Sequence, residues 1–236
     1  MPHFFISSKN VQNDFVILDD KETLKHLVGS LRVKVGEKLK FIDENEIQYF
    51  TIVENTSKKE LKAKIEECSP SKRKLNFELH LVMSVLKQEA QSLAISNATQ
   101  CGVSEIFPVL TRNCVPKKDK VEKWQKIAFE AAKQCERANL PKINEISTLE
   151  KVLKNYENKN VIVYAEKYAD LQIRDAVNLV DKTKPIAVVI GPEGGFSEEE
   201  FQYFIDSEFK LVTLGDLIFK APNAVTSGIS NIVTRL

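Results

Sequence analysis

Residues 185–200, which read PIAVVIGPEGGFSEEE, decide the fold of this chain. The apolar run IAVVI has the length and β-branched content of a buried strand, and the two adjacent glycines after it let the backbone bend sharply. Ser197 followed by Glu200 predicts a capping box at a helix start, and Phe196 with Phe201 can close a hydrophobic staple around it. The stretch therefore predicts a strand, a glycine loop and a helix in that order.

This order places free backbone N–H groups at the carboxyl end of a parallel strand, where open α/β sheets bind nucleotide-like ligands. The spacing fits neither G-x-G-x-x-G nor G-x-x-x-x-G-K-[ST], because Pro192, Glu193 or Phe196 stands where a glycine is needed. Glu193 would also repel a phosphate. A purely structural turn is the alternative, and the spacing alone leaves both interpretations open.

Composition limits the protein class. With 236 residues, 43% hydrophobic and 28% charged, the chain is expected to form a soluble globular protein of one or two domains. No basic segment leads into a long apolar run, so we expect a cytoplasmic protein with no membrane partner. The four cysteines lie far apart and the three histidines do not sit at ligand spacings. We therefore expect neither a disulfide framework nor a metal site.

The net charge of +1 is unevenly spread along the chain. Residues 112–142 hold nine Lys or Arg against four Asp or Glu, an excess of +5 that leaves −4 for the rest. Such a patch predicts a polyanionic partner, and a solvated helix face is the alternative. On a helix predicted over 121–138, four cations share one stripe: Lys123, Lys126, Lys133 and Arg137.

The periodicity of the sequence divides the chain in two. Residues 4–69 read as short strands with turns, which predicts a small β-barrel, interrupted by a helical segment at 21–35 that includes Arg32. The polar segment SPSKRK marks a boundary, so we expect domains at 1–72 and 73–236. In the second domain strands alternate with helices. This predicts an α/β fold with a parallel sheet covered on both faces.

Five motifs together resemble the bacterial ribosomal RNA small subunit methyltransferase E family, which belongs to the SPOUT class of knotted methyltransferases. The motifs are HLVGSLRVKVGE at 26–37, CGVSEIFPVLT at 101–111, WQKIAFEAAKQCERANLPKI at 124–143, GPEGGFSEEE at 191–200 and LGDLIF at 214–219. The likeness spans nearly the whole chain. It implies an N-terminal PUA-like barrel, a C-terminal α/β domain with a deep trefoil knot, and a homodimer.

The resemblance also implies a reaction, the transfer of methyl from S-adenosyl-L-methionine to N3 of a uridine in 16S rRNA of the small ribosomal subunit. Backbone groups would hold the adenine and ribose. The cofactor-binding residues it implies are Ile190, Gly191, Pro192, Glu193, Gly194, Gly195, Leu214, Gly215, Leu217, Ile218, Phe219, Asn223 and Ala224. A glycine loop without a lysine suits a ligand that carries a sulfonium instead of a phosphate. Glu193 is a candidate either beside that cation or as an acceptor of backbone N–H groups.

Methylation of a uracil nitrogen needs in-line placement and loss of the N3 proton, and the sequence offers no obvious base. Arg137 and Glu193 are the catalytic candidates. Arg137 can stabilise a uracil oxyanion or clamp a phosphate, and neutralisation of a helix C-terminus is the alternative. RNA contacts are expected from Arg32, Arg112, Lys123, Lys126, Lys133 and Arg137.

Two other functions stay open, because several charged positions of the family differ here. The departures are His3, Asn97, Gln100, Asn113, Leu217 and Pro222. A non-catalytic RNA-binding or ribosome-assembly module of the same fold is one alternative, and methylation of a different RNA is the other. A dimer surface is predicted on a last helix from Pro222, because this helix has more apolar positions than one face needs. Those positions are Ala224, Val225, Ile229, Ile232 and Val233.

Overall fold

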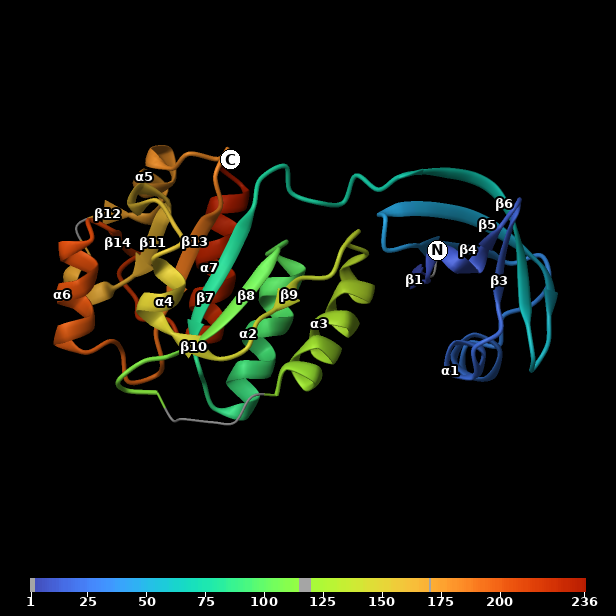
Figure 1. Cartoon of the computed structure of the whole chain (residues 1–236), viewed down its shortest axis with the longest axis horizontal. Coiled ribbons are helices and arrows are strands. Elements are labelled where there is room, and N and C mark those ends of the chain that lie inside the picture. The colour runs from blue at the N-terminus through green and yellow to red at the C-terminus, as the bar shows by residue number, and fades with distance from the viewer. Residues whose placement is uncertain (1–2, 115–119, 170) are drawn as a thin grey trace. The chain divides into compact units, whose positions relative to one another are not determined.

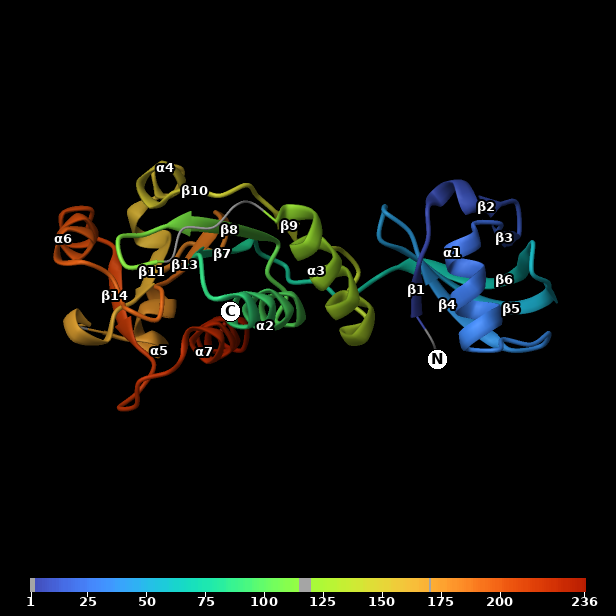
Figure 2. The ribbon, with the colours of Figure 1, turned by 90° about the horizontal axis from the view of Figure 1, so that it is seen from below.

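The structure is a computed structural model that describes residues 3–114, 120–169 and 171–236 (Figures 1 and 2). The chain divides into two compact units. Unit 1 is Met1–Lys74 with Glu136–Asn139, and unit 2 is Leu75–Cys135 with Leu140–Leu236. The four residues Glu136–Asn139 follow a helix of unit 2 but group with unit 1, so the chain connects the two units more than once.

Unit 1 is built on a sheet of mostly antiparallel strands in the order β1-β4-β5-β6-β3-β2; among its described residues, only β1 and β4 pair in parallel. Its strands are β1 (His3–Phe5), β2 (Val11–Gln12), β3 (Phe15–Leu18), β4 (Lys38–Ile42), β5 (Ile47–Thr56) and β6 (Leu61–Pro70), and the 3-10 turn η1 (Ser8–Asn10) precedes β2. Val16, Leu39 and Phe41 are buried in the core of this unit. The short strands predicted for this half of the chain are present.

The helical segment of unit 1 is shorter than the sequence predicts. Helix α1 (Lys21–Leu24) begins at the side-chain cap Asp20 and continues as the π-helical turn η2 (Lys25–Ser30). The prediction of a helix over 21–35 is wrong about its end, because Arg32 has φ +55°. That left-handed conformation cannot continue a right-handed helix.

Unit 2 contains a sheet whose described strands all pair in parallel, as predicted. Its strands are β7 (Leu79–Ser84), β8 (Glu105–Leu110), β9 (Lys142–Ile143), β10 (Ser147–Thr148), β11 (Val161–Tyr164), β12 (Leu171–Gln172), β13 (Ile186–Ile190) and β14 (Lys210–Thr213). Their order is β10-β8-β7-β13-β11-β14-β12, and β9 also pairs with β8. The apolar run IAVVI forms β13.

Helices cover both faces of this sheet. They are α2 (Gln88–Gln100), α3 (Val121–Cys135), α4 (Leu149–Leu153), α5 (Ile173–Ala176), α6 (Glu198–Asp206) and α7 (Ala221–Val233), with 3-10 turns η3 (Asn158–Asn160), η4 (Glu166–Tyr168) and η5 (Val177–Leu179). Alternate residues of β13 face opposite cores: Ile186 and Val188 pack with α2, α3, α5 and α7, whereas Ala187 and Val189 pack with α4 and α6. Figure 2 shows α4 on one side of the sheet and α2 and α7 on the other. No helix among the described residues is long and apolar enough to cross a membrane.

Strand β13 lies at the centre of the sheet although it comes late in the chain. It pairs with β7, where Ile190 is opposite Met83, and with β11, where Val189 is opposite Val163. The chain first builds outward from β7 to β8 and β10, then crosses to β11, and later fills the position between them with β13. Such a reversal of strand order is where open α/β sheets bind ligands, at the carboxyl ends of the strands.

Two helices of unit 2 differ from their predicted form. Helix α3 ends at Cys135 rather than at Ala138, because Glu136 has φ +55°. Arg137 is therefore not on the helix. On α2, helical periodicity predicts that Leu93 points inward, but Leu93 is 51% exposed and Ile95 holds the buried position instead.

Helix α7 does not offer the dimer surface that the sequence predicts. It begins at Ala221, one residue before the predicted Pro222. Four of its five apolar residues, Ala224, Val225, Ile229 and Ile232, are fully buried in the same core as β13. The sequence argument for that surface is wrong, because the apolar excess of α7 is covered within its own unit.

Candidate functional site

The glycine loop, residues 191–195, connects β13 to α6 as predicted. The Ser197 hydroxyl accepts the Glu200 N–H at 3.2 Å, and the Glu200 carboxylate accepts the Ser197 N–H at 2.8 Å. The rings of Phe196 and Phe201 meet edge to face with centroids 5.8 Å apart. The predicted capping box and hydrophobic staple are both confirmed, so local interactions fix where the loop ends.

A cavity of about 500 Å³ lies at the carboxyl ends of β11 and β13. Its volume falls within the range that holds a small-molecule ligand. The lining residues come from three parts of the sheet edge: Tyr164, Ala165, Glu166 and Lys167 after β11, Ile190 to Phe196 after β13 together with Phe201, and Ile218, Phe219, Lys220 and Ala221 before and at the start of α7.

The cavity brings together eight of the residues that the family resemblance assigns to the cofactor. They are Ile190, Gly191, Pro192, Glu193, Gly194, Gly195, Ile218 and Phe219. Five others do not line it: Leu214, Gly215, Leu217, Asn223 and Ala224. Ala224 is fully buried in the core of unit 2, and Asn223 is exposed in the first turn of α7.

Two glycines at this edge need backbone conformations that other residues rarely adopt. Gly195 has φ +71° and Gly215 has φ +130°. The neighbouring Gly194 has no such φ, and a Cβ there would meet the Cβ of Asn113 at 3.2 Å. The left-handed conformation of the glycine loop therefore belongs to Gly195, and Gly194 is constrained by close packing instead.

The side chain of Asn113 and the backbone of Arg112, both after β8, bind the glycine loop and the cap of α6. The Asn113 amide donates to the carbonyl oxygens of Gly194 and Gly195, at 3.3 and 3.1 Å. The Arg112 N–H donates to the Glu200 carboxylate at 2.9 Å, so the residue that caps α6 is tied to the same segment. The glycine loop and the start of α6 are thus both bound to the segment that follows β8.

The wall opposite the glycine loop is held by Tyr164. Its hydroxyl accepts the backbone N–H of Phe219 at 3.3 Å and donates to the Glu166 carboxylate. Before this contact, the loop exposes two large apolar side chains, Leu217 at 77% and Ile218 at 82%. The Thr213 hydroxyl donates to the Gly215 carbonyl at 2.7 Å and fixes the start of the same loop.

Four charged side chains line the cavity: Glu166, Lys167, Glu193 and Lys220. Lys167 forms an ion pair with Glu198 at 2.8 Å. The Glu193 carboxylate accepts the Lys87 N–H, at the start of α2, at 3.5 Å. Of the two predicted roles for Glu193, acceptance of a backbone N–H thus has a partner in the structure. Within the described residues, no cluster of three or more His, Cys, Asp or Glu is arranged to hold a metal ion.

Arg137 lies outside this site, in the segment that groups with unit 1. The residue is 7% exposed, and its guanidinium donates to the side-chain amide oxygen Oδ1 of Asn139 from Nη2 at 2.7 Å and from Nε at 3.2 Å. Next to it, Glu136 forms ion pairs with Lys40 at 2.9 Å and Arg73 at 3.2 Å. The prediction that Arg137 is the fourth cation of the α3 stripe is wrong, because Arg137 follows the end of the helix and is buried.

The other predicted RNA-binding cations are spread over the molecule. Lys123 and Lys126 are exposed on α3, and Lys133 is half-buried beside Glu130, with an ion pair of 3.0 Å. Arg112 is exposed after β8, and Arg32 is exposed in unit 1. Lys117 and Lys118, which contributed to the basic count of 112–142, lie outside the described residues.

Sequence reasoning missed the third wall of the cavity, formed by residues 164–167. The sequence predicts the strand VIVYAE at this place, so the signal was available: a tyrosine and a glutamate at the carboxyl end of a buried parallel strand. What the sequence did not show is that β11 lies directly beside β13. That neighbourhood follows from the late insertion of β13.

Comparison with known proteins agrees with this arrangement. A model described as the RNA methyltransferase domain matches residues 73–233, and one described as the RNA methyltransferase PUA domain matches residues 18–66. The ribosomal RNA small subunit methyltransferase E of Mesomycoplasma hyopneumoniae is 30% identical over 95% of each chain. The protein of that name from Aquifex aeolicus is 30% identical over 97% of each chain.

Solved structures share the fold over the full length. The crystal structure of the ribosomal RNA small subunit methyltransferase E from Neisseria gonorrhoeae, bound to S-adenosyl methionine, has a TM-score of 0.85 at 22% identity, covering 99% of this chain and 97% of that one. An RNA methyltransferase predicted in Thermotoga maritima has a TM-score of 0.67 at 26% identity, covering 98% and 97%. The chain thus belongs to the ribosomal RNA small subunit methyltransferase E family of RNA methyltransferases.

Proposed function

We propose that this protein transfers a methyl group from S-adenosyl-L-methionine to N3 of a uridine in the 16S rRNA of the small ribosomal subunit. The observation that carries the proposal is the cavity of about 500 Å³ between the glycine loop and the Tyr164–Phe219 contact. Family membership supports an RNA methyltransferase activity, and the relative from Neisseria gonorrhoeae was crystallised with S-adenosyl methionine.

The residues of the cavity fit this cofactor. Ile190, Ile218 and Phe219 provide apolar surface for an adenine ring. The carboxylate of Glu193 suits a ligand that carries a sulfonium cation, and no lysine stands in the glycine loop to bind a phosphate. Lys167, which is paired with Glu198, and Lys220 also line the cavity, so its walls carry both signs of charge, as does S-adenosyl-L-methionine.

Bound S-adenosyl-L-methionine supplies an electrophilic methyl group, whose bond to sulfur breaks as the bond to uridine N3 forms. The protein contributes mainly position, because in-line alignment accounts for much of such a barrier. The Asn113 clamp on the glycine loop and the Tyr164 contact on the opposite loop are the interactions that hold the two walls. The N3 proton must leave as well, and we assign no residue to that step.

The proposal includes the finer features of the family fold. A trefoil knot at the loops 191–195 and 214–219 is supported by the insertion of β13 between β7 and β11. A PUA-like barrel at 1–72 and a methyltransferase domain at 73–236 are supported by the two family matches. We also propose a cytoplasmic homodimer, on the resemblance alone. Sedimentation of the intact protein as a monomer at micromolar concentration would contradict the dimer.

RNA contact by the exposed cations is part of the same proposal. Lys123, Lys126 and Lys133 lie on one helix, and each lysine that binds a phosphate should contribute about 0.7 to 0.9 to the salt slope of RNA affinity. We expect the triple Lys→Ala variant to lose about 2 units of slope with a 16S rRNA fragment. Lys182→Ala, which changes an exposed lysine in the loop before β13, is the matched control. An unchanged slope in the triple variant would leave the α3 lysines as a solvated face.

Arg137 stays a prediction for the reaction itself, because no contact of the structure tests it. Its bonds to Asn139 favour a structural role in unit 1. The substitution Arg137→Lys separates the roles, since lysine cannot reproduce a bidentate fork. A structural role predicts lower stability of unit 1 with methylation restored at low temperature, whereas a role at the target base predicts lost methylation in a stable protein.

The test of the proposed function is methyl transfer from labelled S-adenosyl-L-methionine to 30S subunits that lack the modification, followed by mapping of the modified nucleotide. We expect label in 16S rRNA, at N3 of one uridine. If the protein binds the cofactor and 30S subunits but transfers no methyl, it is a non-catalytic module of this fold. Label that appears only in another RNA, such as tRNA, would overturn the substrate.

A further inference from the structure

One carboxylate of the cavity is held in a fixed orientation. Glu166 begins the turn η4, two residues after the end of β11, and lines the cavity beside the glycine loop. The Tyr164 hydroxyl donates to its Oε1 atom. Among the described residues, none makes a hydrogen bond to Oε2. One oxygen of the carboxylate is therefore bound by the protein and the other is available to a ligand.

Tyr164 is itself fixed by a second bond. Its hydroxyl accepts the backbone N–H of Phe219 at 3.3 Å, so the same oxygen links two walls of the cavity. Burial, and then the hydrogen bond with Glu166, raise the pKa of Tyr164 to about 12. The hydroxyl is consequently protonated at neutral pH and can only donate toward the carboxylate, which keeps Glu166 an acceptor.

We propose that Glu166 recognises the ribose of the cofactor by accepting hydrogen bonds from its vicinal hydroxyls, with Tyr164 as its positioning residue. This inference rests on the proposed function. A carboxylate offers only acceptors and a vicinal diol offers two donors, and an acidic residue near the end of a parallel strand serves the ribose in dinucleotide sites in the same way. This side-chain contact adds to the backbone contacts that the family resemblance implies for the adenine and ribose.

The orientation of the carboxylate distinguishes this role from attraction to the sulfonium. Coulomb attraction to a cation depends on distance and little on the plane of the carboxylate. Hydrogen bonds to hydroxyls are directional, and they weaken steeply away from a linear geometry. A tyrosine hydroxyl that fixes one oxygen is therefore useful for a diol and of little use for a point charge.

The chain offers a matched control for this pair. Glu198 at the start of α6 accepts the hydroxyl of Tyr168 and the ammonium of Lys167, but it does not line the cavity. Glu198→Gln and Tyr168→Phe thus remove a carboxylate and a hydroxyl in the same kind of contact. Tyr168→Phe is the primary control, because Glu198→Gln also removes the partner of Lys167, which lines the cavity. An effect that Tyr168→Phe shares with the Glu166 and Tyr164 variants is not due to the cavity.

The experiment is calorimetric titration of the full-length protein with S-adenosylhomocysteine and with its 2′-deoxy and 3′-deoxy forms. We expect Glu166→Gln to weaken binding of S-adenosylhomocysteine about 10-fold, the usual effect of a hydrogen bond to a charged group. The parent protein should bind the deoxy ligands about 10-fold more weakly than S-adenosylhomocysteine. For Glu166→Gln this difference in affinity should be less than about 2-fold, because removal of the ligand hydroxyl and removal of the carboxylate abolish the same contact. Tyr164→Phe should bind S-adenosylhomocysteine a few-fold more weakly than the parent protein. It should still bind the deoxy ligands more weakly than S-adenosylhomocysteine, but by a smaller factor than the parent does.

Three results would overturn the inference while the proposed function stands. The first is unchanged affinity of a folded Glu166→Gln protein for S-adenosylhomocysteine. The second is an equal loss of affinity for the deoxy ligands in the parent protein and in Glu166→Gln. The third is weaker binding of S-adenosyl-L-methionine with unchanged binding of S-adenosylhomocysteine, which lacks the sulfonium and would place the carboxylate beside that cation. If the parent protein binds neither ligand, the proposed function fails as well. Thermal unfolding of each variant establishes that it is folded.

Discussion

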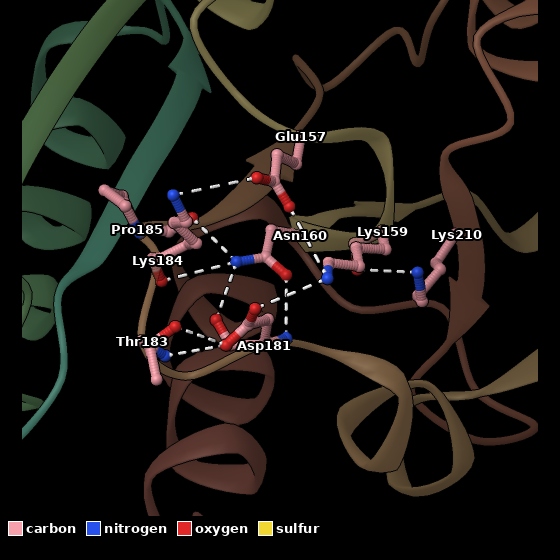
Figure 3. A network of polar contacts seen from close by, with 8 residues as sticks. All are labelled: Glu157, Lys159, Asn160, Asp181, Thr183, Lys184, Pro185 and Lys210. Atoms are coloured by element: carbon pink, nitrogen blue, oxygen red, sulfur yellow. Dashed lines mark hydrogen bonds and ion pairs between the residues drawn. The ribbon is translucent and has the colours of Figure 1, made fainter.

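The amino ends and the carboxyl ends of the same strands in the unit 2 sheet have different surroundings. At the amino edge, before β11, β13 and β14, polar groups form a closed network (Figure 3). The fully buried Asn160 amide donates to the carbonyl oxygens of Asp181, Lys184 and Pro185 at 2.9 to 3.3 Å, and its oxygen accepts the Asp181 N–H at 2.8 Å. The Lys210 ammonium donates to the Lys159 carbonyl at 2.6 Å.

At the carboxyl edge the same strands lead to an open cavity. Its loops depend on left-handed glycines, on one asparagine clamp and on one tyrosine contact, and they expose Leu217 and Ile218. The two edges therefore have different roles. The amino edge holds the strands in place through hydrogen bonds to the buried Asn160, and the carboxyl edge provides a surface that can bind a ligand. Substitutions at the amino edge should change stability, whereas those at the carboxyl edge should change binding.

Asn160→Ala should have the largest effect. Three carbonyls and one N–H that meet at the fully buried Asn160 would lose their partner, which costs about 3 kcal/mol of unfolding free energy. Urea unfolding measures the loss, and the folded fraction should bind S-adenosyl-L-methionine as the parent does. Asn178→Ala, an exposed asparagine with one bond to the Arg174 carbonyl, is the control and should change stability by less than about 0.5 kcal/mol. Equal losses in the two variants would contradict the role of the network.

Gly195→Val should follow, because it forces a β-branched residue into φ +71°. The left-handed conformation costs about 2 kcal/mol, and the distorted loop should also weaken cofactor binding. A Cβ at this position would meet no protein atom within 4 Å, so backbone strain rather than a clash of the Cβ accounts for the expected loss of stability. Gly194→Ala is the comparison, where the Cβ meets Asn113 at 3.2 Å and no strained φ is involved. Calorimetry that finds parent affinity in a folded Gly195→Val protein would remove the glycine loop from the site.

Asn113→Ala should separate binding from stability at the carboxyl edge. It removes the donor to the Gly194 and Gly195 carbonyls, which are exposed and can bond to water, so the stability loss should be about 1 kcal/mol or less. Affinity for S-adenosyl-L-methionine should fall several-fold, because the loop loses its clamp. A stability loss as large as that of Asn160→Ala, with unchanged affinity, would erase the contrast between the edges.

Asp181→Asn should give the smallest effect, present at neutral pH and lost in acid. Hydrogen bonds from the Thr183 hydroxyl and N–H lower the pKa of Asp181 from 3.8 to about 2. A lowered carboxyl pKa stabilises the fold above the unfolded value and loses that contribution as the pH falls through the folded value. The stability difference between parent and variant should therefore shrink between about pH 4 and pH 2. Unfolding curves at several pH values check this, and a difference that is constant with pH would contradict it.

Local interactions in the sequence were sufficient to predict the strand, the loop and the helix start at 186–200. The β-branched run 186–190, the Ser197–Glu200 capping box and the Phe196–Phe201 staple act over a few residues, so their letters predict strand, loop and helix start. The same holds for the alternation of strands and helices, which predicts a parallel sheet. Each of the five family motifs is one continuous stretch of sequence, so the sequence alone was sufficient to indicate an RNA methyltransferase.

The tertiary structure decided what the periodicity could not. Helix ends at Arg32 and Glu136 depend on left-handed backbone that pattern reasoning does not see, and the second of these removed Arg137 from the α3 stripe. The apolar residues of α7 suggest a dimer surface only because the sequence does not show how many neighbours a helix has. The insertion of β13 beside β11 placed Tyr164 and Glu166 next to the glycine loop. Strand order is set by long-range packing, and no local signal encodes it.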